Sequence, residues 1–293
     1  MRVCIGITTK NRKKIVVKAI ESALSQDYTD VEVFVFDDGS TDGTSQLREN
    51  YPEVRWERSE TSLGLLEARN RMMRTCGAEI FVSLDDDAWF LKNDEVRIAV
   101  NYFKADPKLA VVAFDLLERD SDRFKVVERA NPVSTNFYKG GGHALLLNAV
   151  KLAGYYVPFP VKYGHEEKDL GIQIIDLGYD MIFLPGVHVW HDYTPVGRNV
   201  ADQSNSFIIN DLVYKYRRVP LVYVLPVLLA SIIRSLRNKV RHGTTGKEAV
   251  KTFFSLVPEQ KKHVNRVSIK TYLKYRQLSK SYLAYRSENK HFS

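Results

Sequence analysis

The first hundred residues alternate between two hydrophobic patterns. Short apolar runs typical of buried strands occur at residues 3–8, 31–36 and 79–84. Between them, apolar side chains recur at helical spacing over residues 15–24 and 65–76. Strands that alternate with helices predict an α/β fold, with a mostly parallel sheet covered by helices on both faces.

Polar side chains follow each of these strands where it ends. Thr8, Asp38 and Asp87 come at or just after the ends of the three predicted strands. Ligands of such sheets bind outside the carboxyl ends of the strands. We therefore expect these side chains to converge on one crevice, although they are far apart in the sequence.

The third strand runs directly into three consecutive aspartates, Asp85, Asp86 and Asp87. Adjacent carboxylates repel one another, and a cation relieves that repulsion. Mg²⁺ and Mn²⁺ bind oxygen ligands, typically one or two carboxylates together with substrate phosphates. The triplet favours a divalent metal site, and the alternative is an acidic turn that caps the next helix.

Two other acidic segments have both a structural and a functional interpretation. Asp38 lies among turn formers, where it can cap a helix or bind the ribose or base of a nucleotide. Glu166, Glu167 and Asp169 begin a predicted helix at 166–177, where carboxylates interact favourably with the helix dipole. A carboxylate at the mouth of the crevice can also act as a general base toward a hydroxyl.

Between residues 120 and 165 the pattern weakens into short strands and loops, including Gly140, Gly141 and Gly142. His188 and His191 then follow a short predicted strand at 181–184. Imidazole is a good ligand for divalent metals, so His191 becomes a candidate if it lies near Asp87. A histidine with no ligand role, in the core or on the surface, is the alternative.

Five segments occur in this order: TTKNR (8–12), FDDGSTDGT (36–44), Gly64 with ARN (68–70), LDDD (84–87) and EEKDL (166–170). In order and spacing, over roughly residues 1–195, they resemble the family 2 inverting glycosyltransferases of GT-A fold. The resemblance implies a Rossmann-like sheet flanked by helices, and a donor that is a nucleoside-diphosphate sugar of the UDP or dTDP type. It also implies that five residues bind the nucleotide: Thr8, Arg12, Asp38, Arg69 and Asp85. Thr8 and Asp38 would contact the base, and Asp85 would lie near the ribose.

The same resemblance assigns Asp87 and His191 to the Mn²⁺ or Mg²⁺ that bridges the diphosphate. Glu167 matches the catalytic base, which takes a proton from the acceptor hydroxyl in a single inverting displacement. The family usually has aspartate at that position, so Glu166 remains a rival for the role. The implied acceptor is a lipid-linked or polysaccharide glycan.

Charge divides the chain near residue 211. Residues 212–293 contain 18 Lys and Arg against three acids, a net charge of +15, whereas residues 1–211 carry −7. We therefore predict a catalytic domain at 1–211 and a basic helical region at 212–293 that docks on a membrane or self-associates. Residues 219–233 are uncharged, but this segment is too short for a membrane-spanning helix and contains two prolines. It is better suited to a helix that lies in the plane of a lipid surface.

Two alternatives exist for residues 212–293. The first, which stays open, is that these helices pack on the catalytic body. Aromatic and basic residues interleave over 272–286, as in nucleic-acid-binding surfaces, but no nucleic-acid-binding motif accompanies them, and we expect no nucleic acid partner.

Cys4 and Cys76 show neither metal-ligand spacing nor a disulfide framework, which suits a reducing cytoplasm. The first residues lack the apolar length of a signal peptide. We expect a location at the inner face of the cell membrane.

Two rival functions remain. A sugar-phosphate nucleotidyltransferase predicts a glycine-rich loop after the first strand, and residues 8–12 contain no glycine. A non-catalytic membrane-bound scaffold of the same fold is disfavoured by intact Asp38, Asp87 and Glu167.

Overall fold

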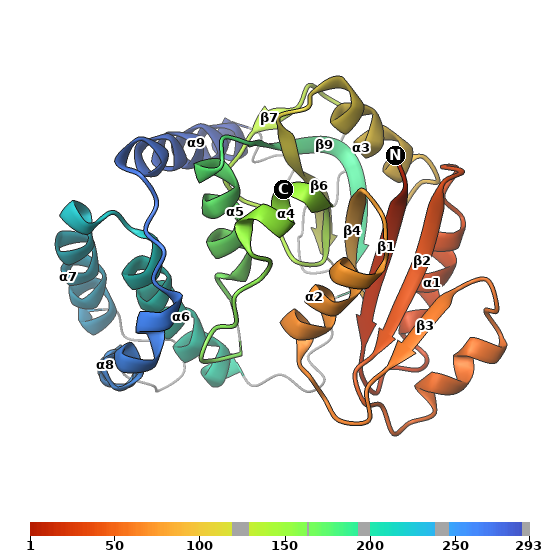
Figure 1. Ribbon diagram of the computed structural model, residues 1–293, viewed down its shortest axis with the longest axis horizontal. Coiled ribbons are helices and arrows are strands. Elements are labelled where there is room, and N and C mark those ends of the chain that lie inside the picture. The colour runs from red at the N-terminus through yellow and green to blue at the C-terminus, as the bar shows by residue number, and fades with distance from the viewer. Residues whose placement is uncertain (119–128, 163, 193–199, 238–245, 289–293) are drawn as a thin grey trace.

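A computed structural model describes residues 1–118, 129–162, 164–192, 200–237 and 246–288 (Figure 1). One sheet with the order β3-β2-β1-β4-β8-β6-β9-β5 forms its centre, and β7 pairs with β9. The strands are β1 (Val3–Thr9), β2 (Val31–Asp37), β3 (Arg55–Arg58), β4 (Ile80–Asp85), β5 (Ala88–Phe90), β6 (Leu109–Glu118), β7 (Val133–Ser134), β8 (Gly142–Leu146) and β9 (Asp180–His191).

Helices lie on both sides of this sheet and beyond one edge of it (Figure 1). The α-helices are α1 (Val16–Leu24), α2 (Leu65–Thr75), α3 (Glu95–Ala105), α4 (Leu147–Ala153), α5 (Glu166–Asp176), α6 (Val200–Arg218), α7 (Leu221–Arg237), α8 (Gly246–Gln260) and α9 (Ile269–Glu288). Two short 3₁₀ segments are η1 (Thr44–Glu49) and η2 (Lys261–His263).

Strands β3, β2, β1 and β4 are parallel, as the alternating pattern predicts. Thr8 is level with Phe36 of β2 and Asp85 of β4, so the three strands end at one edge of the sheet. Side chains of β1 alternate between two core layers, because Ile7 packs in the cluster of α1 and Cys4 in that of α2. The predicted α/β class and the convergence of the strand ends are confirmed.

Beyond β4 the sheet becomes mixed. β8 is antiparallel to β4 and β6, whereas β6 and β9 are parallel. β9 is much longer than the strand predicted at 181–184, because it continues through a bulge after Leu184 as far as His191. Ala88 of β5 pairs with His191, so this extension brings the histidine beside the acidic turn.

The C-terminal helices pack on one another and on the sheet domain. α6 contacts α7 and α8, while α9 contacts α5 and β7 (Figure 1). Tyr275 and Tyr282 of α9 are buried in the same core cluster as Leu170 of α5. The boundary predicted at 211/212 lies inside α6. Among the described residues, none of the helices combines the length and apolar character that crossing a membrane requires.

Candidate active site

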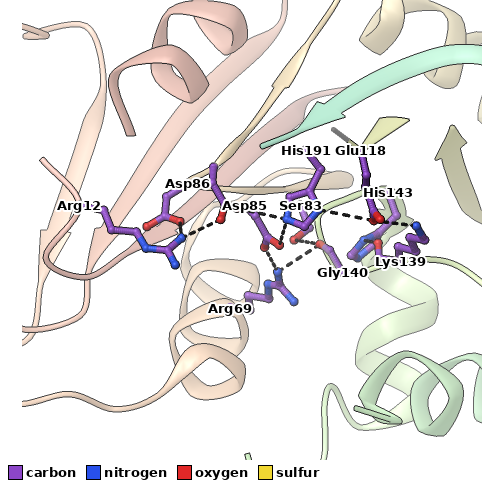
Figure 2. Close-up of polar contacts among 11 residues, drawn as sticks. Arg12, Arg69, Ser83, Asp85, Asp86, Glu118, Lys139, Gly140, His143 and His191 are labelled. Carbon is purple, nitrogen blue, oxygen red and sulfur yellow. Dashed lines mark hydrogen bonds and ion pairs between the residues drawn. The ribbon is translucent and has the colours of Figure 1, made fainter. Parts of the chain in front are cut away.

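The acidic triplet lies at the end of β4 and in the turn to β5, where Asp85 pairs with Arg69 and Asp86 with Arg12 (Figure 2). Asp86 accepts hydrogen bonds from Thr9 Oγ1 (2.9 Å) and Arg12 Nη1 (2.7 Å). The same arginine nitrogen lies 2.9 Å from Asp87 Oδ2. Burial raises the pKa of Asp86 to about 6, although Arg12 opposes the shift. Asp86 therefore anchors Arg12 and the first strand to the turn.

Asp85, Asp87 and His191 form a cluster whose ligand atoms lie within 4.8 Å of one another. His191 Nε2 is 3.3 Å from Asp87 Oδ1 and 3.9 Å from Asp85 Oδ2. Burial lowers the pKa of His191, but hydrogen bonds to Asp87 and Glu118 outweigh it and raise the pKa to about 9. This corner of the site therefore favours a positive charge, and two carboxylates with one imidazole are a donor set that fits Mn²⁺ or Mg²⁺.

Gly140 and Gly141 bring the backbone against the charged side chains of the site. A Cβ on Gly141 would lie 2.9 Å from Asp85 Oδ2, and one on Gly140 would lie 2.7 Å from Glu167 Oε1. Arg69 Nη2 donates to Asp85 Oδ1 at 2.5 Å and to Gly140 O at 3.1 Å (Figure 2). The segment of Gly140 and Gly141, predicted only as a loop, therefore forms a wall of the site. The cluster of Asp85, Asp87 and His191 lies against this wall, and so does Glu167.

His143 of β8 contacts the backbone just before Gly140. Its Nδ1 lies 2.9 Å from Lys139 O, and its Nε2 lies 3.2 Å from the Tyr156 hydroxyl. Burial, and then the nearby charge of Arg69, lower the pKa of His143 to about 3. The imidazole is therefore neutral at physiological pH and serves to position the loop.

Glu166 and Glu167 begin α5, directly after Gly164 and His165, which have positive φ angles of 88° and 78°. Burial and the neighbouring charge of Glu166 raise the pKa of Glu167 to about 8. Burial also raises the pKa of Glu166. A carboxyl group that titrates near neutral pH is suited to proton transfer. Asp169 lies in the same first turn of α5, and its carboxylate also pairs with Arg218 of α6.

Thr8 and Asp38 lie at the carboxyl ends of β1 and β2. The Asp38 carboxylate accepts hydrogen bonds from Ser62 Oγ (2.6 Å), Leu63 N (2.6 Å) and Gly64 N (3.1 Å). Asp38 therefore fixes the segment that leads into α2. This role agrees better with the structural interpretation of Asp38, as a turn and cap residue, than with direct binding of a nucleotide. Thr8 Oγ1 is buried and makes no hydrogen bond within the described part of the chain.

The two candidate histidines, His188 and His191, have different surroundings. His191 lies in the cluster, whereas His188 lies 3.7 Å from Asp115, and burial lowers its pKa to about 4. No sequence motif pointed to Glu118, whose Oε1 is 3.7 Å from His191 Nδ1. It lies in none of the five segments and reaches the site only because it pairs with His191 between β6 and β9.

A search for relatives agrees with this geometry. The family model described as glycosyl transferase family 2 matches residues 4–161. Chondroitin synthase from Escherichia coli is 39% identical over 114 residues, which are 38% of this chain and 16% of that protein. The chain therefore spans only a small part of the length of this curated relative.

Two solved structures share the fold. Residues 1–349 of S. aureus TarS in complex with UDP superpose with a TM-score of 0.63 at 18% identity, covering 89% of this chain and 82% of that one. The mannosyltransferase PcManGT from Pyrobaculum calidifontis, in complex with GDP-Man and Mn²⁺, gives a TM-score of 0.56 at 19% identity, covering 94% and 84%. With more than half of its length matched by the family model, the chain belongs to glycosyl transferase family 2.

Proposed function

We propose that this chain transfers a sugar from a nucleoside-diphosphate sugar to an acceptor hydroxyl, with inversion at the anomeric carbon. The observation that carries the proposal is the Gly140–Gly141 segment, where Asp85 lies against Gly141, and Arg69 and Glu167 lie against Gly140. A diphosphate-binding cluster and the half-buried Glu167 carboxyl group are thereby held beside the same short backbone segment.

The donor side of the site supplies positive charge close to the carboxylates. Arg12 pairs with Asp86, and Arg69 pairs with Asp85. Guanidinium groups at this position can also attract the negative charge of a diphosphate. The carboxylates of Asp85 and Asp87 alone would repel a diphosphate, so these two residues and His191 would hold Mn²⁺ or Mg²⁺ there. The cation supplies stabilisation of the negative charge that develops on the leaving diphosphate.

We propose a UDP- or dTDP-type donor. TarS is described in complex with UDP and with UDP-GlcNAc, and PcManGT with GDP-Man. Thr8 supports a base-binding role, since its buried hydroxyl has no partner among the described residues. Asp38 would then contribute mainly by shaping the adjacent 62–64 segment.

Glu167 performs the proton transfer in this proposal. Its carboxylate takes the proton of the acceptor hydroxyl as the hydroxyl oxygen bonds to the anomeric carbon. The bond between that carbon and the diphosphate oxygen breaks, and both bonding electrons leave with the nucleoside diphosphate. Attack from the opposite face in one step inverts the configuration. Glu166 raises the pKa of Glu167 and is the less favoured base.

The acceptor is proposed to be a lipid-linked or polysaccharide glycan, and residues 212–293 to dock on the cytoplasmic face of a membrane. The apolar side of α7 supports docking, since Leu221, Leu225 and Leu229 are 73%, 65% and 50% exposed. Arg234 and Arg237 follow in the last turn, where they can contact anionic headgroups. Self-association through this helix is the alternative.

A donor-hydrolysis screen over UDP-, dTDP- and GDP-sugars, with and without Mn²⁺, tests the enzyme proposal. We expect turnover with one donor class that stops when a chelator is added and is restored by Mn²⁺. Glu167→Gln should lower transfer by about 10³-fold or more while leaving donor affinity unchanged, and Glu166→Gln is the matched comparison. Formation of a nucleoside triphosphate and a sugar 1-phosphate from these donors when pyrophosphate is added would indicate a nucleotidyltransferase instead. Failure to bind or hydrolyse any donor would indicate a scaffold.

A further inference from the structure

A cavity of about 550 Å³ lies between α5, α6, α7 and α9, outside the site already described. Its walls come from both parts of the chain, because Lys139 and Lys168 belong to the body and Arg276 and Arg286 to α9. The size is within the range of pockets that hold small organic ligands or a few sugar rings. None of the motifs discussed above accounts for it.

The lining of this cavity is strongly cationic. Five of its side chains are basic, Lys139, Lys168, Lys215, Arg276 and Arg286, and Asp211 is the one acid among its described lining residues. Lys215 is already paired with Asp211, and Lys139 with Glu118 at 2.9 Å.

The other three cations are less well compensated. Within the described residues, Lys168, Arg276 and Arg286 form no ion pair with a carboxylate. Burial lowers the pKa of Lys168, with Asp211 opposing that shift, which indicates that the protein alone solvates this ammonium group poorly. An anionic ligand would supply the missing negative charge.

Aromatic rings form much of the remaining surface. Tyr214, Tyr272, Tyr275 and Tyr282 line the cavity together with Phe137, and Phe137 and Tyr282 lie with their ring centroids 6.1 Å apart. Flat apolar rings with hydroxyl edges suit the faces of sugar rings, which are apolar while their rims are polar. An inorganic anion needs no such rings.

The cavity shares its wall with the proposed base. Lys139 immediately precedes Gly140, and a Cβ at Gly140 would meet Glu167 Oε1 at 2.7 Å. Lys168 immediately follows Glu167 on α5. A ligand that fills the cavity therefore lies against the same two segments that hold the proton acceptor.

We propose that this cavity binds an acidic segment of the acceptor glycan, with sugar rings on the tyrosines and ring-borne carboxylate or phosphate groups on Arg276, Arg286 and Lys168. The proposal deepens, and rests on, the proposed glycosyl transfer. It explains why the C-terminal helices contribute a cationic, aromatic wall beside the catalytic body. A neutral glycan would supply no negative charge to these three cations.

The test is calorimetric binding to the full chain without any donor. The probes are an oligogalacturonate tetrasaccharide, a maltotetraose phosphorylated at O6 of its terminal residue, unmodified maltotetraose, and inorganic phosphate. We expect at least one acidic tetrasaccharide to bind about tenfold or more tightly than maltotetraose and phosphate. Which of the two binds identifies carboxylate or phosphate as the recognised group.

The variant for this test is R276Q/R286Q, which changes two side chains that are not fully buried, and the control is Lys280→Gln on the same helix outside the lining. We expect the double variant to lose about tenfold or more of the affinity for the acidic tetrasaccharide, and the control to bind like the parent. An unchanged thermal midpoint of the double variant confirms that α9 is intact. If it shifts, the single variants R276Q and R286Q are measured instead.

Equal affinity for acidic and neutral tetrasaccharides, tighter binding of phosphate alone, or full affinity in the arginine variants would overturn the proposal. No binding of any tetrasaccharide would overturn it as well. Because no donor is present, a failure of donor turnover in the separate screen would refute the proposed glycosyl transfer without altering this result.

Discussion

The Asp169 carboxylate lies 2.7 Å from both Nε and Nη2 of Arg218, and both side chains are 1% exposed. Asp169 is two residues after Glu167 on α5, and Arg218 ends α6. Arg218 also donates to the carbonyl oxygens of His263 and Asn265. One buried ion pair therefore ties the helix of the proposed base to the C-terminal region.

Removal of one member of this pair should destabilise the whole chain. Arg218→Met leaves the Asp169 charge buried without its partner, and we expect a loss of about 3–5 kcal/mol in the free energy of unfolding. Denaturant unfolding followed by circular dichroism measures it. The matched control is Lys274→Met, which breaks an exposed pair with Asp180 and should cost less than about 1 kcal/mol. Equal losses in the two variants would contradict the structural role assigned here.

The raised pKa of Glu167 predicts how stability depends on pH. Its pKa is about 8 in the folded chain against an ordinary value of 4.5, so between these values the folded state holds more protons than the unfolded state. The free energy of unfolding contributed by this group therefore falls as pH rises from about 4.5 to 8. Glu167→Gln removes the effect.

We expect Glu167→Gln and the parent to have similar stability at pH 5, and the variant to be more stable at pH 9 by roughly 1–3 kcal/mol. Parallel urea titrations at the two pH values measure this difference. The same series with Glu166→Gln should also show a pH-dependent gain, because burial raises the pKa of Glu166 and its charge raises the pKa of Glu167. A difference between variant and parent that does not change with pH would show that Glu167 titrates normally.

Gly140→Ala should impair activity much more than folding. The added methyl group would lie 2.7 Å from Glu167 Oε1 and 3.2 Å from Arg69 Nη1, so both functional side chains must move. We expect transfer to fall about 10²-fold or more, as for small misplacements of catalytic groups. Steady-state kinetics with the donor found in the screen, together with a thermal midpoint, gives both quantities.

Gly178→Ala is the contrasting variant for that experiment. A Cβ there meets nothing within 4 Å, but the residue has φ of +91° after the end of α5. It should cost about 1 kcal/mol of stability and leave transfer unchanged. If Gly140→Ala retained parental turnover, the glycine wall would have no part in the reaction.

The exposed side of α7 should control attachment to lipid. L225E/L229E places two carboxylates on the apolar side, and we expect binding to vesicles with 30% anionic lipid to fall at least tenfold in a flotation assay. Leu152→Glu is the control, because Leu152 is 59% exposed on α4, away from this helix. Parental binding by L225E/L229E would refute docking through α7, and a change in sedimentation behaviour would favour self-association.

These point variants are better than deletion of residues 212–293. Deletion would remove Arg218 and leave Asp169 unpaired, and it would also uncover the core that Tyr275 and Tyr282 complete. A loss of lipid binding after deletion would then be indistinguishable from unfolding.

The local pattern of the sequence determined the parallel half of the fold and most of the candidate site residues. Period-two and period-3.6 hydrophobicity depends only on neighbouring residues, so β1, β2, β4, α1, α2 and α5 could be predicted from it. Asp85 and Asp87 were identifiable because they lie in a run of three acids after an apolar strand, whereas Glu167 was singled out by the resemblance to the glycosyltransferase family. The rule that parallel strands end at one edge of a sheet predicted the convergence of Thr8, Asp38 and Asp87.

The tertiary structure alone decided which of the remaining groups reach the site. Glu118 and His191 meet only through the pairing of β6 with β9, and Gly140 matters only because Glu167 and Arg69 approach it in space. Asp169 looked like one more acid of a helix N-terminus until α6 placed Arg218 against it. Contacts between segments distant in sequence leave no local periodicity, so the acidic triplet could be found by reading the chain and its surroundings could not.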